Sequence, residues 1–474
     1  MLLGFIILYL VSTLLLGWWS SRFVKNTRDF VVGGGNMPLM IVATGMFAEW
    51  FGSETIMGAS AEFTEKGFMG VIEDPFGAAL CLFLVGILLV KPLYKLKLLT
   101  FSDYFRQRFD RKTETLSAML MIPSYFGWIA AQLIALSVIL HVVTKDVIPG
   151  GLPTEAGVIL CAIVVTGYTY VGGLWAVSLT DFVETILIVG GLSTLLISVM
   201  HDAGGFQHVI DQTPKDFFRI TPHFEFKDIV EYIAAWITVG LGSIPQQDVF
   251  QRVMSAKSER VAVRASFISS VMYLSVALVP LFIGLCGKIL YPELVEKDPQ
   301  MLIPQMVLQH SGLTLQILFL GALLSGILST SSGAILAPAT LIGENIIRPR
   351  FKNLTDKQVL LSMRLSVVGV AGLSAALALM RHNIYKLVGQ ASAISLVCLF
   401  VPLMGGVYWK RANHVGAIAS MIVGLISWII PEAYGSEYPS IIYGLLGSIG
   451  GMILGSLLTP PIRTPTDAVK VINS

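Results

Sequence analysis

The sequence predicts an all-α polytopic membrane protein with about thirteen transmembrane helices. Two observations carry this prediction. Of the 474 residues, 54% are hydrophobic and only 13% are charged, which is outside the range of soluble globular domains. Apolar runs long enough to cross a bilayer recur along the chain, and the longest hydrophilic loop, residues 201–228, is too short to hold a core of its own. We therefore expect one transmembrane domain, residues 1–474.

The apolar runs form four groups. Residues 3–20 give a leading helix, and residues 415–460 give two trailing helices, at 415–432 and 441–460, before a tail at 461–474. Residues 37–200 contain five spans, at 37–61, 70–91, 114–143, 155–172 and 175–200. Residues 229–408 contain another five, at 229–247, 265–290, 312–343, 360–380 and 385–408. Two groups of five spans fit an inverted repeat.

Charge sets the expected orientation in the cell membrane. Arg22, Lys25 and Arg28 follow the first span, which lacks a small-residue cleavage site, so we expect an uncleaved helix with its N-terminus outside. Alternating the later spans places 23 of the 32 lysines and arginines on the cytoplasmic side. This asymmetry agrees with the positive-inside rule and puts the C-terminus in the cytoplasm.

The span 37–61 is interrupted by polar residues. Its middle reads A-E-W-F-G-S-E, residues 48–54, and a charge at the bilayer centre costs at least ~2.5–3.5 kcal/mol, so Glu49 and Glu54 should face protein or water. Gly52 lets the helix unwind and frees backbone carbonyls, which are ligands for a cation. The alternative is a kinked helix with snorkelling or protonated glutamates.

A second interruption and a hydroxyl cluster extend this pattern. The span 229–247 ends in G-L-G-S-I-P-Q-Q-D, at the position in its group that 37–61 has in the first, and paired broken helices indicate a midplane binding site. Within 312–343, residues 325–333 read S-G-I-L-S-T-S-S-G, where Ser329, Thr330 and the Gly326 carbonyl suit an alkali cation. The alternatives are an ordinary Gly/Pro kink and close helix packing.

Aromatic and polar side chains near the interruptions predict a solute pocket. Trp50 lies in the first interruption, Trp128 in the span 114–143, and Trp236 just before the second interruption, which holds Gln246 and Gln247. Indole faces attract cations. The alternative for each tryptophan is an interfacial or lipid-facing position. Glu73 and Asp74 precede Pro75 and form either an exposed cap or the rim of a vestibule.

The chain lacks the motifs that several classes of function require. The chain has no G-x-x-x-x-G-K-[ST] motif for ATP and no G-x-S-x-G or Ser/His/Asp set, so it is not expected to be a pump or an enzyme. The seven histidines are scattered, which predicts no transition metal and no cofactor, and a net charge of +2 does not indicate nucleic acid. All four cysteines lie in apolar runs and are expected to pack. A secondary transporter or a channel remains.

Three motifs resemble the sodium/solute symporter family: G-G-L-W-A-V-S-L-T-D-F-V-E at 172–184, Q-Q-D-V-F-Q-R-V-M-S-A-K-S-E at 246–259 and L-S-T-S-S-G at 328–333. The resemblance implies the leucine-transporter-like fold of five plus five spans. It implies a sodium site built from the carbonyls of Ala48, Phe51 and Gly326 and the hydroxyls of Ser329 and Thr330. It also places Asp181 near the cytoplasmic route for sodium.

Residues 48–62 and 242–252 are most similar to the choline-transporter branch of that family, in which Trp50 forms one wall of an aromatic cage. This chain has Gln246 where that branch has Trp, and Ser332 where some members have Asp. A quaternary amine such as choline and an amino acid or other zwitterion both remain open as solutes. The expected solute-binding residues are Trp50, Glu54, Asp74, Trp128, Gln246 and Gln247.

We therefore expect a sodium-coupled symporter that imports a small organic solute by alternating access, with Na⁺ as the co-transported ion. Sugars and monocarboxylates are alternative solutes. An uncoupled channel or a solute sensor with the same fold is the alternative function.

Overall fold

The computed structural model describes residues 2–20, 22, 24–145, 147–351, 353–380 and 383–460. The expected tail at 461–474 lies outside the described residues. The regular structure in the described part is helical, apart from one bridge between Met37 and Ala256. Nine of its helices are long and apolar enough to cross a membrane, and Leu39–Trp50 and Thr154–Gly167 are shorter apolar helices. The all-helical membrane architecture is confirmed, whereas the count of thirteen spans stays a prediction.

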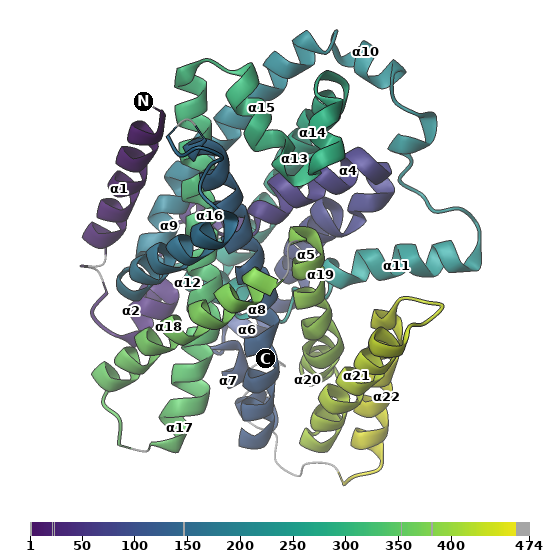
Figure 1. Cartoon of the computed structure of the whole chain (residues 1–474). Coiled ribbons are helices and arrows are strands. Elements are labelled where there is room, and N and C mark those ends of the chain that lie inside the picture. The colour runs from purple at the N-terminus through teal and green to yellow at the C-terminus, as the bar shows by residue number, and fades with distance from the viewer. Residues whose placement is uncertain are drawn as a thin grey trace.

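The first part of the chain (Figure 1) begins with α1 (Leu2–Ser20), α2 (Thr27–Val32) and α3 (Leu39–Trp50). Helical structure resumes at Glu54–Ala59 and continues through α4 (Ser60–Lys66) to α5 (Ala78–Leu84) and α6 (Val90–Tyr94). Next come α7 (Phe101–Arg108), α8 (Arg111–Thr144), α9 (Thr154–Asp202) and the short α10 (Phe206–Asp211). Gly173, at φ 63° and ψ 178°, divides α9 where the sequence predicts the boundary between the spans 155–172 and 175–200.

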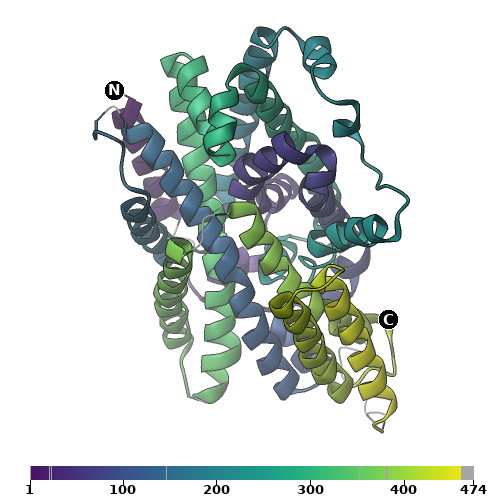
Figure 2. The ribbon, with the colours of Figure 1, turned by 45° about the vertical axis from the view of Figure 1, so that its right-hand side comes forward.

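The second part begins with α11 (Phe226–Gly240), α12 (Gln247–Ser255) and α13 (Glu259–Leu290), followed by α14 (Pro292–Lys297) and α15 (Leu302–His310). Helix α16 (Leu313–Leu341) runs on through Ile342–Ile347 to α17 (Arg348–Arg350). Helices α18 (Asp356–Met380), α19 (Ile384–Ser395) and α20 (Val401–Tyr408) complete this part. The last pair, α21 (His414–Tyr434) and α22 (Ser440–Leu457), pack against each other at one edge of the molecule, as Figure 2 shows.

Polar residues fix where several helices begin. Thr100 and Asp103 form a reciprocal capping box at the start of α7, and Asp110 accepts from the Thr113 N–H at the start of α8. Ser258 caps α13 in the same way. These caps define the short connections at one end of the bundle.

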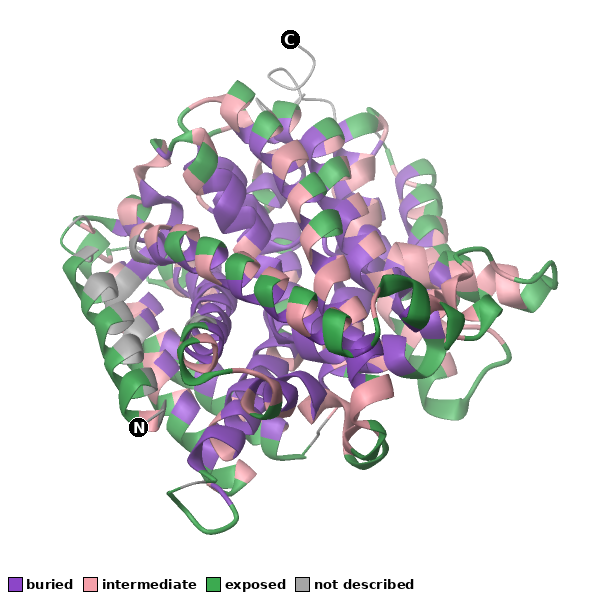
Figure 3. Ribbon diagram, turned by 90° about the horizontal axis from the view of Figure 1, so that it is seen from above, coloured by how far each residue is buried: buried purple, intermediate pink, exposed green. Residues whose placement is uncertain are grey.

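Burial is arranged as expected for a protein in lipid. Seen from above, buried residues concentrate in the middle of the bundle and exposed ones at its rim (Figure 3). Large apolar side chains are nevertheless exposed on the rim, for example Ile163 and Ile197 on α9, Leu365 on α18 and Leu446 on α22. An exposed apolar belt of this extent indicates a lipid-facing surface.

Helix α3 lies in the centre of the bundle, packed against α9, α13 and α16. Its start is tied to the end of α12, because the Met37 N–H donates to the Ser255 carbonyl at 2.9 Å and the Lys257 N–H donates to the Met37 carbonyl at 3.0 Å. The two interrupted segments are therefore neighbours in space although about 200 residues separate them in the sequence.

Candidate functional site

The first interruption is an unwound turn after α3. The helix ends at Trp50, and Phe51 has the non-helical angles φ −84° and ψ 66°. A Cβ atom on Gly52 would lie 2.7 Å from Glu54 Oε2 and 2.9 Å from Gln132 Oε1, so a larger residue here would have to displace these two hydrogen-bonded side chains. The Trp50 carbonyl, freed from the helix, accepts from the Tyr273 hydroxyl at 2.8 Å. The break predicted from residues 48–54 is present in the structure.

The second interruption, residues 241–246, separates α11 from α12. A Cβ on Gly242 would meet the carbonyls of Thr238 at 2.1 Å and Ser392 at 2.4 Å, so close backbone packing requires this glycine. The hydroxyls of Ser243 and Ser392 lie 3.0 Å apart. Asp248, in the first turn of α12, accepts from the Trp50 indole N–H at 2.9 Å, which joins the two interruptions directly.

The expected sodium ligands come from α3 and α16, with α9 alongside. The Thr330 hydroxyl donates to the Ala48 carbonyl at 2.9 Å, and the Ser329 hydroxyl donates to Asp181 Oδ1 at 2.5 Å. These four residues are brought together. Phe51 is buried just after α3, and Gly326 lies one helical turn before Thr330.

A buried ion cluster adjoins this hydroxyl pair. The guanidinium of Arg252, on α12, lies 2.5 Å from Glu49 Oε2 and 2.9 Å from Asp181 Oδ2, and it donates to the Ser178 hydroxyl at 2.7 Å. The side chains of Arg252, Glu49 and Asp181 are at most 3% exposed. Asp181 therefore connects the cluster to Ser329. The cluster was not predicted from the sequence, although each charged member lies in one of the quoted motifs.

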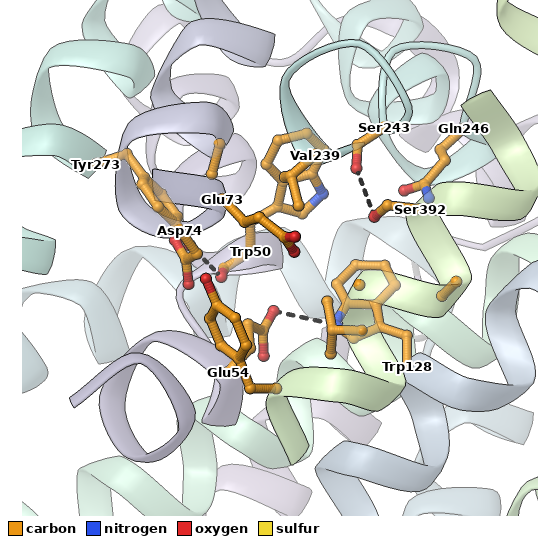
Figure 4. A pocket seen from close by; sticks show the side chains of 15 residues that line it. Trp50, Glu54, Glu73, Asp74, Trp128, Val239, Ser243, Gln246, Tyr273 and Ser392 are labelled. Atoms are coloured by element: carbon orange, nitrogen blue, oxygen red, sulfur yellow. Dashed lines mark hydrogen bonds between the residues drawn. The ribbon is translucent and has the colours of Figure 1, made fainter. Parts of the chain in front are cut away.

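A cavity of about 40 Å³ lies between the two interruptions, and most of its accessible lining is apolar. Figure 4 shows Trp50 and Trp128 on its walls, with Gln246 and Ser392 facing them and carboxylates beside the indoles. Fifteen residues line it: Trp50, Glu54, Glu73, Asp74, Ala78, Trp128, Val239, Ser243, Gln246, Tyr273, Tyr385, Val388, Gly389, Ala391 and Ser392.

Five of the six expected solute-binding residues, Trp50, Glu54, Asp74, Trp128 and Gln246, line this cavity. Gln247 does not. Its Oε1 accepts from the Phe101 backbone N–H at 2.6 Å, and its side chain is buried against α7. Trp236 is also outside the cavity, with its ring 6.2 Å from that of Phe76.

The acidic side chains of the cavity are held in different ways. Glu54 accepts the Trp128 indole N–H at 3.0 Å and the Gln132 amide at 2.6 Å, one on each oxygen. Asp74 accepts the Thr55 hydroxyl at 2.7 Å on Oδ2. Asp74 is 5% exposed, so the exposed-cap alternative is wrong for this residue. None of the fifteen lining residues is Lys, Arg or His, so the lining holds three acidic side chains and no basic one.

The cavity adjoins a wide vestibule. Glu73, Tyr385 and Gly389 line both spaces, and the vestibule has a volume of about 980 Å³. Glu62, Glu231 and Glu432 are among the charged residues around it. The expected topology places this vestibule on the outer face.

The opposite end of the bundle is tied together by polar contacts. The Asn345 amide donates to Asp103 at 3.1 Å and to Glu114 at 2.9 Å, which joins α7, α8 and the segment after α16. All three side chains are buried. Arg108 donates to the Gly406 carbonyl at 2.7 Å, which adds α20 to this closure.

Several residues of the site were not predicted from sequence. Gln132 is a polar residue inside the apolar α8, a signal that sequence reasoning could have used. Asp248 belongs to a quoted motif but received no role. Tyr273 and Tyr385 give no sequence signal, because tyrosine is common in packed membrane helices.

A helical membrane bundle in which two interrupted helices meet at a cavity with acidic and aromatic side chains is the architecture of a secondary transporter. The model of the sodium:solute symporter family matches residues 30–424, and the chain belongs to this family. It is a membrane transporter that couples sodium to the symport of a small solute.

Two curated relatives agree with this assignment, and a solved structure shares the fold. The human high affinity choline transporter 1 is 27% identical over 450 residues, covering 90% of this chain and 75% of the relative. The osmoregulated proline transporter OpuE of Bacillus subtilis is 27% identical over 485 residues, covering 97% and 95%. The structure of a Na⁺-coupled sialic acid symporter in a substrate-bound outward-open state superposes with a TM-score of 0.83 at 21% identity, covering 97% and 98%. This last likeness concerns the fold.

Proposed function

We propose that the chain imports a small organic cation together with Na⁺ by alternating access across the cell membrane. The observation that carries this proposal is the cavity lining, which combines aromatic walls with three carboxylates and has no basic side chain. Trp50 and Trp128 offer faces that attract a cation. A cation bound beside Glu54, Glu73 and Asp74 offsets their mutual repulsion in a low-dielectric site.

A zwitterionic solute fits this lining less well. Its carboxylate would enter a space that already holds three acidic side chains, and it would find no Lys, Arg or His there. Like charges brought together in a desolvated site repel strongly. The names of the choline-transporter relatives agree with a cationic solute, and the name of the proline relative makes a zwitterion the competing outcome of the test.

For sodium, we propose a site between the unwound end of α3 and the hydroxyls of α16. The Ala48 carbonyl and the Thr330 hydroxyl already face each other, and hard oxygen ligands suit a small alkali cation. The carbonyls of Phe51 and Gly326 and the Ser329 hydroxyl complete the proposed set. Asp181 lies beside Ser329 and would receive the ion on its way to the cytoplasm.

During the transport cycle, the outer and the inner side of the bundle would close in turn. The cavity adjoins a wide vestibule on the side that the topology makes external, while buried polar contacts tie the other end. We further propose that residues 37–200 and 229–408 form the inverted repeat, with an external N-terminus and a cytoplasmic C-terminus. Rocking one group against the other would then open the inner side.

Uptake into proteoliposomes tests the proposal. Radiolabelled choline and ethanolamine, as representative cations, should accumulate with an inward Na⁺ gradient, and a negative-inside potential should increase the uptake because charge moves inward. Radiolabelled proline serves as the zwitterion. Equal cation uptake in potassium and sodium buffers would contradict sodium coupling, and accumulation of proline without either cation would contradict the cationic solute.

A further inference from the structure

We propose that the cavity selects an amine that keeps N–H donors, in preference to a fully methylated ammonium, and that Asp74 accepts one of these donors. The inference rests on the proposed import of an organic cation and narrows its chemical class. It commits to a small primary, secondary or tertiary amine in its protonated form, without a carboxylate.

The first observation is an acceptor without a donor. Asp74 Oδ1 is buried and has no hydrogen-bond partner among the described residues, whereas Oδ2 accepts from the Thr55 hydroxyl at 2.7 Å. Buried polar atoms are nearly always hydrogen-bonded, and an unpartnered carboxylate oxygen beside a cavity marks a place for a donor from a ligand. A protonated amine supplies both the N–H and the opposite charge.

The position of Asp74 is fixed by its neighbours. The Thr55 hydroxyl that donates to Asp74 accepts from the Tyr273 hydroxyl at 2.6 Å, and the same Tyr273 hydroxyl lies 2.8 Å from the Trp50 carbonyl. This chain runs from the first interruption to Asp74. The carboxylate is thus held at the cavity edge before the solute arrives, which lowers the ordering cost of binding.

The other acidic residues of the cavity have different roles. Both oxygens of Glu54 already accept side-chain N–H groups, from Trp128 and Gln132, so Glu54 fixes an indole and contributes charge. Glu73 is half-buried at the boundary with the vestibule and can attract any cation. Of the three, Asp74 alone has a buried oxygen left without a donor among the described residues.

The remaining lining also favours a hydrogen-bonding solute over a quaternary one. The side of the cavity that faces the indoles carries Ser243, Ser392 and Gln246 (Figure 4). A trimethylammonium group gains most when aromatic faces surround it, and it offers no donor. Bound here, it would leave Asp74 Oδ1 unpaired, as it is in the structure, whereas an amine N–H would supply the missing hydrogen bond.

A methylation series tests the inference at nearly constant charge. Ethanolamine, N-methylethanolamine, N,N-dimethylethanolamine and choline have three, two, one and no N–H bonds on the ammonium. Binding of each to the purified full chain is measured by isothermal titration in saturating Na⁺. We expect a loss of at least tenfold in affinity between dimethylethanolamine and choline, where the last donor disappears, and smaller losses between the earlier members.

Two variants separate Asp74 from general charge attraction. Asp74→Ala should weaken the binding of ethanolamine and abolish the tenfold difference in affinity between dimethylethanolamine and choline. Glu73→Gln, the matched control, should weaken all four cations by a similar factor and keep this difference. If Asp74→Ala does not yield folded protein by size-exclusion chromatography, the series on the parent protein decides alone.

The outcomes distinguish the two proposals. Choline binding as tightly as dimethylethanolamine, or more tightly, would overturn the amine inference and leave cation import standing, as would an unchanged tenfold difference in Asp74→Ala. Binding of none of the four, with binding of proline, would overturn the cationic solute itself and the inference with it.

Discussion

Replacing Arg252 by glutamine should cost more stability than changing an exposed charge. The guanidinium is 2% exposed and contacts Glu49 at 2.5 Å and Asp181 at 2.9 Å, so its loss leaves two buried carboxylates without a counter-charge. Removing one partner of a buried ion pair costs about 3–5 kcal/mol. We expect Arg252→Gln to lower the free energy of unfolding by this amount, because the lost contacts belong to one buried cluster.

The free energy of unfolding can be measured for the purified protein by denaturant titration in mixed micelles. Arg260→Gln is the matched control, because Arg260 is exposed on α13, and its cost should stay within about 0.5 kcal/mol. The double variant Glu49→Gln/Arg252→Gln should be more stable than Arg252→Gln alone, because one of the uncompensated carboxylates is gone. Arg252→Gln as stable as Arg260→Gln would refute the reasoning.

Three further predictions follow from the site. Thr330→Ala should raise the Na⁺ concentration for half-maximal uptake about tenfold while expression stays normal, because it removes one hydroxyl ligand worth ~1.5 kcal/mol; an unchanged Na⁺ dependence would place the ion elsewhere. The topology can be tested in a background without the four buried cysteines. There, Phe224→Cys should react with an impermeant maleimide on intact cells, and Lys257→Cys should react only after permeabilisation. The reverse result would invert the topology. Gln246→Trp should raise the affinity for choline relative to ethanolamine by adding an aromatic face, whereas Trp50→Ala should lower the affinity for each ligand about tenfold or more. Titration with choline and with ethanolamine measures these affinities. Unchanged affinities in the two variants would mean that the solute binds outside this cavity.

Local chemistry made the helices and their interruptions predictable from sequence. An apolar run in lipid must satisfy its backbone internally and therefore becomes a helix. Gly52 and Gly173 mark places where the chain leaves that geometry, and Glu54 marks a place that cannot face lipid. These signals lie within a few residues of the feature they predict.

Side-chain direction and long-range pairing were not predictable in this way. Gln246 and Gln247 are adjacent and chemically identical, yet Gln246 precedes α12 and lines the cavity, while Gln247 begins α12 and points to α7. Which of the two faces the cavity depends on where the helix starts. The cluster around Arg252 joins residues that are 71 and 203 positions away, Asp181 and Glu49, and only the packed fold brings them together.

The unwound turn after α3 is where sodium and solute would influence each other. On one side, the Ala48 carbonyl faces Thr330 in the proposed ion site; on the other, the Trp50 ring lines the solute cavity and its carbonyl is bonded to Tyr273. Trp50 therefore lies between two proposed sodium ligands, two residues after Ala48 and directly before Phe51. An ion that orders this turn removes part of the ordering cost of solute binding. Thermodynamic linkage then requires bound solute to raise the affinity for sodium by the same factor. The ratio of the solute affinities measured with saturating Na⁺ and without Na⁺ therefore gives the coupling directly.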